Sequence, residues 1–381
     1  MKKVVSAFFI LLAGIQLNAQ EPILAAVSKE VAGKEALVTG VPQQAAYVPD
    51  FKCDGRSGKV RNVILLIGDG MGLGAVASAY FANGEQLTMT SLRSMGYACT
   101  QSLSSFTTDS AASGTAYATG SKTKNRHLGT DKDGKPLQNI PEAIAPAGKV
   151  SGVVSTDDVH GATPAAYFAH QTDRKKVAEI WGDIPACRLS FISAGSRKLF
   201  EKQASETRSA IESRYKVIYD PSQDIAGAER VIYLPPTVKT GERGNYLPET
   251  TKMAIDFLAA QKSKGFFLMV EGARIDKVAH ANKLDELVNE MLDFDKAVEV
   301  AVRFAEKDGH TLVIVTADHE TGGVTLKSGG SHEPGSVAAV FAGRGHTPIF
   351  VPLFAYGPHS RDFACMQQNS DVAQKILGLL K

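Results

Sequence analysis

Short, mainly apolar runs in this 381-residue chain each lead into an acidic side chain, and this repeated pattern limits the folds available to it. The three runs and their acids are Val63–Ile67 with Asp69, Phe266–Val270 with Glu271, and Leu312–Thr316 with Asp318. Runs without a polar face are typical of strands buried on both sides in a parallel sheet. Such strands end at one edge, where α/β proteins bind ligands. The sequence therefore predicts that the three acids converge, although any one of them alone would suit a helix cap.

Further strand-like and helix-like segments alternate along the chain. We expect strands at Val60–Ile67, Val150–Ser155, Gly265–Val270, His310–Thr316 and Ile349–Tyr356, and helices at Ala143–Ala147, Thr250–Lys262 and Asp285–Glu306. Strands that alternate with helices indicate an α/β fold. The predicted architecture is a three-layer sandwich with a large, mostly parallel central sheet and helices on both faces.

The chain divides into three parts by composition. Residues 1–19 have the basic start, short apolar core and small-residue end of a signal peptide, and we expect cleavage after about Ala19. Residues 20–58 read as an extended lead-in, and residues 59–381 as one catalytic domain with surface insertions at about 181–244 and 322–344. The first insertion contains strand-like Tyr215–Tyr219 and Arg230–Leu234, so it belongs to the same layered fold. A second independent domain is the less simple alternative.

The expected signal peptide sets the compartment. It predicts a periplasmic or secreted protein, periplasmic if the source is Gram-negative and extracellular otherwise. The apolar run from Val4 to Leu17 is too short for a comfortable membrane span, and no later segment approaches the roughly 20 apolar residues that a span needs. We therefore expect no membrane span.

The charge balance and the cysteines bear on whether the protein binds nucleic acid, forms disulfides or holds a metal through cysteine. The chain has 42 basic and 40 acidic residues, and removing residues 1–19 takes away Lys2 and Lys3 and no acid, which leaves 40 against 40. This balance gives no indication of a nucleic-acid partner. Cys53, Cys99, Cys187 and Cys365 allow two disulfides in any of three connectivities, or four free thiols. Their wide spacing disfavours a cysteine metal site.

Two histidines are separated from an aspartate by a spacing that is common among metal ligands. Asp276 and His280 are four residues apart, which puts both side chains on one face of a helical turn. An isolated pair of this kind is more often a surface ion pair, but Glu271 precedes it by only five residues. Asp318 and His319 are adjacent, and in a turn both side chains can point into one crevice. Oxygen and imidazole ligands together suit Zn²⁺.

A serine follows Thr108-Asp109 at the start of a run of small residues, Ser110 to Ala116. Serine at a helix start is usually a cap. The same position also aims backbone N–H groups and the positive end of the helix dipole at a phosphate. The sequence shows no histidine paired with Ser110, so a nucleophilic Ser110 would need another group, such as a bound zinc ion, to lower its pKa.

These motifs make the chain resemble the alkaline phosphatase family, from about Asn62 to Gly357. Thr108-Asp109-Ser110-Ala111-Ala112 and Thr316-Ala317-Asp318-His319 are highly specific to that family. The resemblance implies a phosphorylated serine, two zinc ions and one magnesium ion. The implied residues are Ser110 as the nucleophile, Asp276, His280 and His346 at the first zinc ion, Asp69, Asp318 and His319 at the second, and Asp69, Thr163 and Glu271 at the magnesium ion.

Other positions are matched less directly. His346 is preferred over His332 and His359 because it precedes the strand-like Ile349–Tyr356, as the family's last histidine does. The resemblance also implies that Arg174 grips the phosphate with a planar fork. Lys277 resembles a lysine that lies near the phosphate through water, and we assign it a tuning role.

The chain departs from the family just before Thr163. Relatives tend to carry Asp or His two positions earlier, where this chain has Gly161, with His160 one step further back. Asp157 and Asp158 are further candidates, but both are also placed to cap a helix. The identity and occupancy of the third metal therefore stay open.

The expected reaction is hydrolysis of small-molecule phosphate monoesters in two steps, through phosphorylated Ser110. A phosphodiesterase or sulfatase on the same scaffold is the nearest alternative, but such relatives usually carry threonine or a modified cysteine as the nucleophile. A catalytically inactive metal- or phosphate-binding protein is the alternative of another class. A homodimer is what the family suggests.

Overall fold

The protein is described by a computed structural model that covers residues 33–327 and 334–381. The expected signal peptide and residues 20–32 of the lead-in lie outside the described residues. Ten strands form one central sheet in the order β15-β3-β14-β9-β2-β8-β4-β5-β7-β6. Their bounds are β2 Asn62–Gly68, β3 Ser94–Cys99, β4 Val150–Ser155, β5 Phe191–Ser193, β6 Lys216–Ile218, β7 Val231–Tyr233, β8 Phe266–Gly272, β9 Thr311–Ala317, β14 Val351–Tyr356 and β15 Met366–Gln368.

The sheet is parallel except for one strand. β14 runs antiparallel to both of its neighbours, β3 and β9, whereas every other pair of neighbours in the sheet is parallel. Parallel strands joined by helices need both faces of the sheet to be covered. The observed sheet confirms the predicted mostly parallel α/β sandwich.

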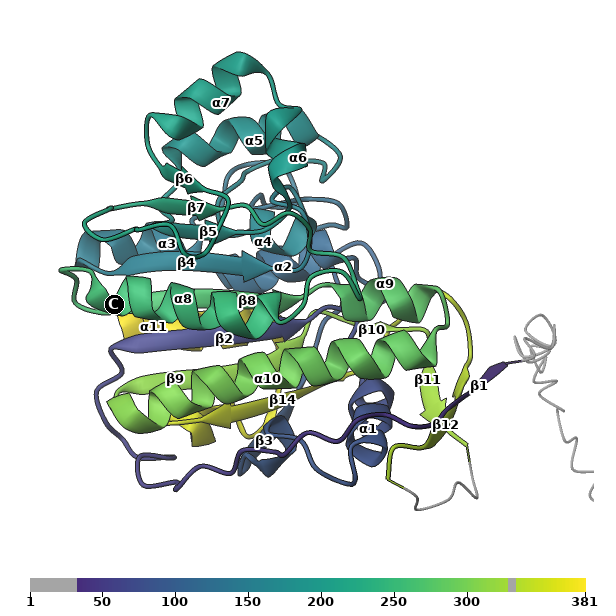
Figure 1. Cartoon of the computed structure of the whole chain (residues 1–381). Helices are drawn as coiled ribbons and strands as arrows, with labels where there is room; N and C mark the ends of the chain where they lie inside the picture. Colours follow the sequence, from purple (N-terminus) through teal and green to yellow (C-terminus); the bar gives the residue numbers. More distant parts are fainter. Residues whose placement is uncertain (1–32, 328–333) are drawn as a thin grey trace, which may run out of the picture. The chain divides into compact units, whose positions relative to one another are not determined.

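Both faces of the sheet are buried under helices. Along β2, Ile64 and Leu66 belong to one apolar core, and Val63, Leu65 and Ile67 to the other. Figure 1 shows α8 and α10 on one face and α3 and α11 on the opposite one. The helices of the first core are α1 Leu73–Ala82, α8 Tyr246–Ala260, α9 Arg274–His280 and α10 Leu284–Asp308. Those of the second are α2 Ser110–Thr119, α3 Ile140–Ile144, α4 Ala162–Ala165, α5 Val177–Asp183, α6 Arg197–Glu201, α7 Ser205–Glu212 and α11 Asn369–Leu380.

The region 181–244 contributes directly to the central sheet. β5, β7 and β6 form one end of it, with α6 and α7 beside them in Figure 1. The strands expected at Tyr215–Tyr219 and Arg230–Leu234 are present as β6 and β7, each shorter by one residue at either end. The helix expected at Ala143–Ala147 begins earlier, at Ile140, and continues as a 3₁₀ turn over Ala145–Ala147.

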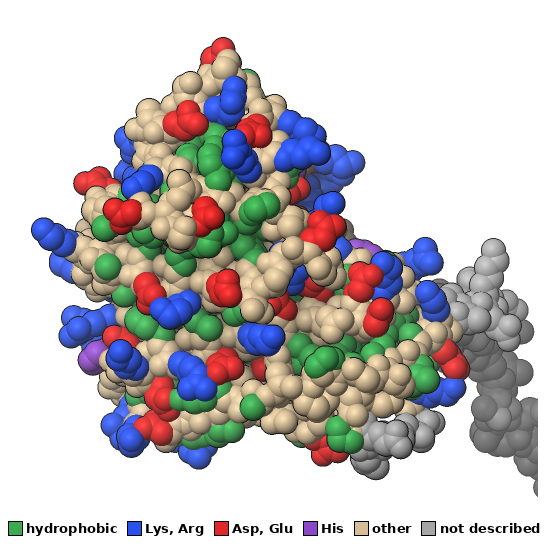
Figure 2. Space-filling view, in the orientation of Figure 1, with side chains coloured by type: hydrophobic (Ala, Val, Ile, Leu, Met, Phe, Trp, Pro, Cys, Tyr) green, Lys and Arg blue, Asp and Glu red, His purple; other side chains and the backbone are tan. Residues whose placement is uncertain are grey.

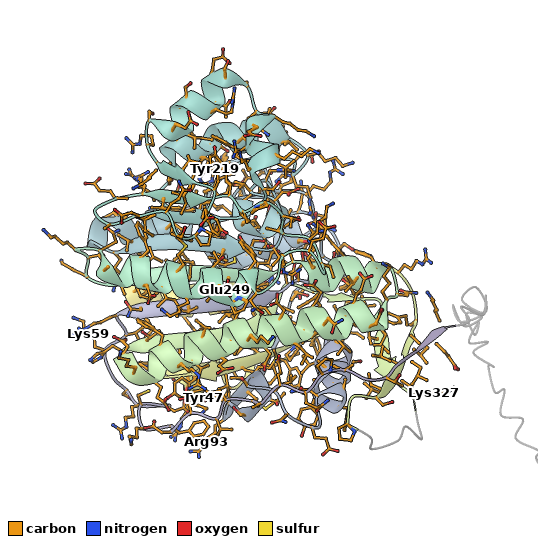
Figure 3. All side chains as sticks on the ribbon, in the orientation of Figure 1. Tyr47, Lys59, Arg93, Tyr219, Glu249 and Lys327 are labelled. Carbon is orange, nitrogen blue, oxygen red and sulfur yellow. The ribbon has the colours of Figure 1, made fainter. Side chains whose placement is uncertain are left out.

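Residues 33–58 run along the outside of the folded unit. β1 (Lys34–Val38) pairs antiparallel with β12 (Val337–Phe341), which pairs with β11 (Val324–Leu326). Further along, the guanidinium of Arg303 on α10 lies 3.7 Å from the ring centroid of Tyr47, and Figure 3 shows Tyr47 beside that helix. The guanidinium of Arg93 covers the ring of Phe51 in the same way. The region 322–344 thus forms a small sheet with the lead-in, apart from residues 328–333, which are not described.

The four cysteines are free thiols, so the alternative with two disulfides is wrong. Three of them face other polar groups instead of each other. Cys187 Sγ lies 3.1 Å from the Tyr215 hydroxyl, and Cys365 Sγ lies 3.6 Å from Lys375 Nζ. Cys53 Sγ lies 3.5 Å from the Tyr356 hydroxyl.

The surface carries interspersed charges. Figure 2 shows basic and acidic side chains mixed over the visible face, in keeping with the near balance of the sequence. No helix among the described residues has both the length and the apolar character that crossing a bilayer requires.

A buried group of ion pairs attaches helix α10 to the loop that precedes α8. Arg243 donates to both carboxylate oxygens of Glu290, at 2.8 and 2.5 Å, and to Asp293 at 2.7 Å. The Arg243 and Glu290 side chains are only 4% and 3% exposed. Glu290→Ala removes two of these charge-assisted hydrogen bonds and leaves Asp293 as the remaining carboxylate on the buried guanidinium, so it should lower the free energy of unfolding by about 3 kcal/mol.

The measurement is denaturant unfolding of Glu290→Ala beside Asp256→Ala. Asp256 makes an exposed pair with Lys252, so its loss should change the unfolding free energy by less than about 1 kcal/mol. Equal effects of the two substitutions would contradict a stabilising role for the buried group.

Candidate active site

The carboxyl ends of adjacent strands bring acidic side chains together. β4, β8, β2 and β9 are neighbours, and the register places Gly68 of β2 opposite Ala317 of β9. Asp69 and Asp318 directly follow these two residues, and Glu271 is the penultimate residue of β8. The three acids therefore lie at the same edge of the sheet.

Asp69, Asp318 and His319 form a buried group, here called the second cluster, beside Ser110. His319 Nε2 lies 3.3 Å from Asp69 Oδ1, from Asp318 Oδ2 and from Ser110 Oγ. Four ligands held about 2.0 Å from a zinc ion at tetrahedral angles are about 3.3 Å from one another. Asp69 Oδ1 and Asp318 Oδ2 are buried and have no hydrogen-bond partner among the described residues. The spacing and the unpartnered oxygens fit a zinc ion.

The first cluster consists of Asp276, His280 and His346. His280 Nε2 lies 3.2 Å from Asp276 Oδ1 and 3.2 Å from His346 Nε2, and His346 Nε2 lies 3.5 Å from Asp276 Oδ1. Asp276 and His280 are one turn apart on α9, and His346 begins β13 (His346–Thr347). The His280 side chain is 39% exposed, so this cluster is open to solvent on one side. A metal ion held there would have room for water or substrate as its fourth ligand.

Backbone carbonyls fix the tautomers of both histidines in the first cluster. His346 Nδ1 lies 2.9 Å from the Thr108 carbonyl oxygen, and His280 Nδ1 contacts the Arg344 carbonyl oxygen. A carbonyl oxygen only accepts, so each neutral ring carries its proton on Nδ1. Each Nε2 is therefore left with a lone pair that points into the cluster, which is the arrangement typical of metal-bound histidine.

Asp69, Thr163 and Glu271, which the family resemblance assigns to magnesium, are here called the third cluster. They offer only oxygen ligands, and the Glu271 carboxylate is close enough to act on the pKa of Asp69. The Ser155 hydroxyl donates to Glu271. Thr163 Oγ1 approaches the Glu271 carboxylate but is buried without a well-formed hydrogen bond. Oxygen-only sites suit a hard cation such as Mg²⁺.

Buried negative charge dominates the electrostatics of the site. Burial and the neighbouring carboxylates, Asp318 first among them, raise the pKa of Asp69 well above its usual value. Burial and the Asp157 carboxylate raise the pKa of Glu271 to about 8. Burial lowers the pKa of His319, so its imidazole is neutral and able to act as a ligand. Divalent cations would relieve this repulsion, and the residues present therefore fit them.

Ser110 is the first residue of α2, as its sequence context predicts. Asp109 caps the helix by accepting a hydrogen bond from the Ala112 N–H at 3.0 Å. Arg174 Nη1 lies 3.6 Å from Asp109 Oδ2, so the guanidinium is beside the residue that precedes Ser110. Arg174 lies in a turn before α5 and not in a helix. Lys277 donates to Asp157 and so does not face the serine directly.

Thr321, which no sequence motif indicates, connects the first and second clusters. Its hydroxyl donates to Asp276 Oδ1 at 2.6 Å and lies 3.2 Å from His319 Nδ1. It belongs to β10 (Glu320–Thr321), which pairs with β13 so that Thr321 lies opposite His346. Because it orients a ligand in each cluster, Thr321 is expected to act as a positioning residue.

Replacing Thr321 by valine removes both hydrogen bonds and keeps the shape of the side chain. Zinc affinity, measured by competition with a chromogenic chelator, should fall about 10- to 100-fold. Thr325→Val is the matched control, because Thr325 is exposed on β11 and should leave the affinity unchanged. Equal affinities of Thr321→Val and the parent would show that Thr321 does not orient the ligands.

Comparisons with known proteins identify the family of the chain. The family model described as alkaline phosphatase matches residues 60–206 and 238–342. Alkaline phosphatase 4 of Bacillus subtilis is 35% identical over 71% of this chain, and the match spans 64% of that protein, a little under two thirds. The alkaline phosphatase of Escherichia coli K12 is 30% identical over 82% of this chain and 84% of its own length.

Solved structures agree as well. The alkaline phosphatase from the Antarctic bacterium TAB5 is 34% identical, with a TM-score of 0.79 over 85% of this chain and 99% of that one. Two variants of the TAB5 enzyme, with a histidine replaced by Glu or Asp, hold Mg in the site called M3. From the family match, the identities and the shared fold, we conclude that this chain belongs to the alkaline phosphatase family.

Proposed function

We propose that the protein is an exported, metal-dependent phosphatase that hydrolyses phosphate monoesters through phosphorylated Ser110. The observation that carries the proposal is the placement of Ser110 Oγ 3.3 Å from His319 Nε2, at the same distance from that atom as Asp69 Oδ1 and Asp318 Oδ2. This spacing is the one expected if the hydroxyl is a fourth ligand beside the three residues of the second cluster. Membership of the alkaline phosphatase family supports the same activity.

The three clusters would hold the cations. The first and second clusters, each with a histidine, suit zinc, and the third, with oxygen ligands alone, suits magnesium. The magnesium bound in the M3 site of TAB5 variants supports this assignment. When bound, these cations would supply the positive charge that lowers the pKa of the serine hydroxyl and of water and that neutralises the leaving oxygen.

Ser110 acts as the nucleophile in this proposal. Its Oγ bonds to phosphorus while the bond from phosphorus to the alcohol oxygen breaks, and the alcohol leaves with a proton. Water then bonds to phosphorus as the Oγ–P bond breaks, which releases phosphate and restores the hydroxyl. The N-terminus of the ten-residue helix α2 stabilises negative charge on Oγ throughout.

Arg174 binds the substrate. Its side chain is 34% exposed and is held near Ser110 by Asp109, so two N–H groups can bind two phosphate oxygens. Lys277, 42% exposed and paired with Asp157, contributes positive charge at the edge of the site. Together they favour a dianionic monoester over a diester or a sulfate ester, which carry a single negative charge.

A substrate panel tests the proposal. Zinc- and magnesium-loaded protein is compared on p-nitrophenyl phosphate, bis-p-nitrophenyl phosphate and p-nitrophenyl sulfate, and kcat/KM should be highest for the monoester. A higher value for the diester or the sulfate would overturn the monoesterase assignment. Absence of turnover on all three would favour an inactive binding protein.

Export and assembly are part of the proposal. The basic and apolar start of the sequence supports cleavage after about Ala19, so the N-terminal sequence of the mature protein should begin at Gln20. The family resemblance suggests a homodimer, which light scattering on the purified protein would test. A mature chain that still begins at Met1 would contradict export by this route.

A further inference from the structure

Gly161 is needed for space and not for an unusual backbone conformation. Its φ of −54° and ψ of 145° are open to other residues. A Cβ atom at this position, however, would lie 2.5 Å from Asp157 Oδ2, 2.8 Å from Asp157 Cγ and 2.9 Å from the Asp158 carbonyl oxygen. A side chain at position 161 and the Asp157 carboxylate in its present place therefore exclude each other.

Asp157 is held firmly in that place. Its backbone N–H donates to Ser155 Oγ at 2.8 Å, and the same hydroxyl donates to Glu271. Its Oδ1 accepts a hydrogen bond from Lys277, and its side chain is only 16% exposed. One carboxylate oxygen is thus paired with Lys277, and the other, Oδ2, lies over Gly161.

The carboxylate belongs to the surroundings of the third cluster. Its charge acts on both Glu271 and Asp69, and Lys277 is the cation that pairs with it. Three carboxylates thus share a largely buried region with two cationic side chains, because the Arg274 guanidinium also acts on Asp157. Thr163, two residues after Gly161, is 1% exposed, and its Oγ1 has no hydrogen-bond partner among the described residues. The surplus negative charge and the unpartnered hydroxyl both point to a missing cation.

We propose that Asp157 supplies a carboxylate oxygen to the third cation site, in the space that Gly161 leaves free, and that Lys277 holds it there. This inference rests on the proposed function for the third cluster. Together with Asp69, Thr163 and Glu271, it gives a site made of oxygens alone. Mg²⁺ binds through one or two carboxylates and keeps several waters, so Asp157 Oδ2 serves as a ligand for the ion or for its water shell.

The test measures Mg²⁺ binding, not only activity. Mature protein loaded with two equivalents of zinc is titrated with MgCl₂ by calorimetry. Asp157→Asn keeps the shape but removes the charge, and it should weaken Mg²⁺ binding about 10- to 100-fold. Asp158→Asn is the matched control, because Asp158 pairs instead with His160 at 4.0 Å, and it should bind Mg²⁺ as the parent does.

Two more variants distinguish a ligand from a merely structural residue. Gly161→Ala brings a Cβ atom against both the Asp157 carboxylate and the Asp158 carbonyl oxygen, so it should shift this turn and weaken Mg²⁺ binding although Asp157 is still present. Asp157→Glu keeps the negative charge and should retain at least about tenfold more Mg²⁺ affinity than Asp157→Asn. Thermal melting of each metal-free variant checks that it is folded.

The outcomes separate this inference from the proposed function. If the parent hydrolyses p-nitrophenyl phosphate and Asp157→Asn binds Mg²⁺ with the parent's affinity, the role of Asp157 is wrong and the function stands. If the parent has no turnover while Asp157→Asn loses Mg²⁺ affinity, the cation site stands and the function is wrong. A parent that binds no cation beyond zinc overturns the inference.

Discussion

Replacing Ser110 by alanine should lower kcat for p-nitrophenyl phosphate by at least about 10³-fold while leaving zinc content unchanged. The substitution removes the atom that bonds to phosphorus, whereas the metal ligands of both histidine-containing clusters remain. Ser110 Oγ lies 3.3 Å from His319 Nε2 of the second cluster. Turnover and elemental analysis on the same preparation check the result.

The matched control is Ser105→Ala. Ser105 is exposed in the loop that leads to α2, five residues before Ser110, and its loss should leave kcat unchanged. Turnover of Ser110→Ala close to that of the control would remove the serine from the mechanism. Loss of zinc from Ser110→Ala would instead make the serine a required ligand, and the lost activity would then not isolate its role as nucleophile.

Removing the bound cations should abolish turnover and lower thermal stability together. Without cations, the buried Asp69 Oδ1 and Asp318 Oδ2 have no hydrogen-bond partner among the described residues. A ligand present at 1,000 times its Kd stabilises the folded state by about 4 kcal/mol per site. EDTA treatment followed by p-nitrophenyl phosphate assays and thermal melting measures both effects, and added zinc should reverse them. Unchanged turnover after verified metal removal would contradict the account.

Reloading of the first cluster should depend on pH in a defined direction. The hydrogen bond to Asp276 raises the pKa of His280 to about 9 in the metal-free protein. A proton on His280 Nε2 must leave before a cation binds there, so apparent affinity should fall about tenfold for each pH unit below 9. Zinc competition titrations between pH 6 and 9 would show this slope. An apparent zinc affinity that does not change with pH would show that His280 is not protonated in the metal-free protein.

Strands buried on both faces were the part of the fold best predicted from the sequence. The runs at Val63–Ile67 and Leu312–Thr316 have no polar face, and they form β2 and β9. β3 was not predicted, because Met95 and Tyr97 point outward and leave a short run of mixed character. The antiparallel direction of β14 was also not predicted, since its apolar residues would be buried in either direction.

The sequence predicted those site residues whose positions are set by their own strand or helix. An acid that ends a buried strand, or an Asp and a His one helical turn apart, has its position set by its own element. Thr321 gave no such signal, and Asp157 was only one of two candidates before Thr163. The contacts that place these residues span 45 and 120 residues, to Asp276 and Lys277. The proximity of Ser110 to His319 spans 209 residues and depends on the packing of α2 against the sheet edge.

Trapping the covalent intermediate tests the central claim most directly. Metal-loaded protein is incubated with excess phosphate at mildly acidic pH, quenched with acid, digested and analysed by mass spectrometry. The account predicts one phosphoryl group, on the peptide that contains Ser110, and none in Ser110→Ala. A phosphoryl group on another residue, or turnover by a protein that never carries one on Ser110, would contradict it.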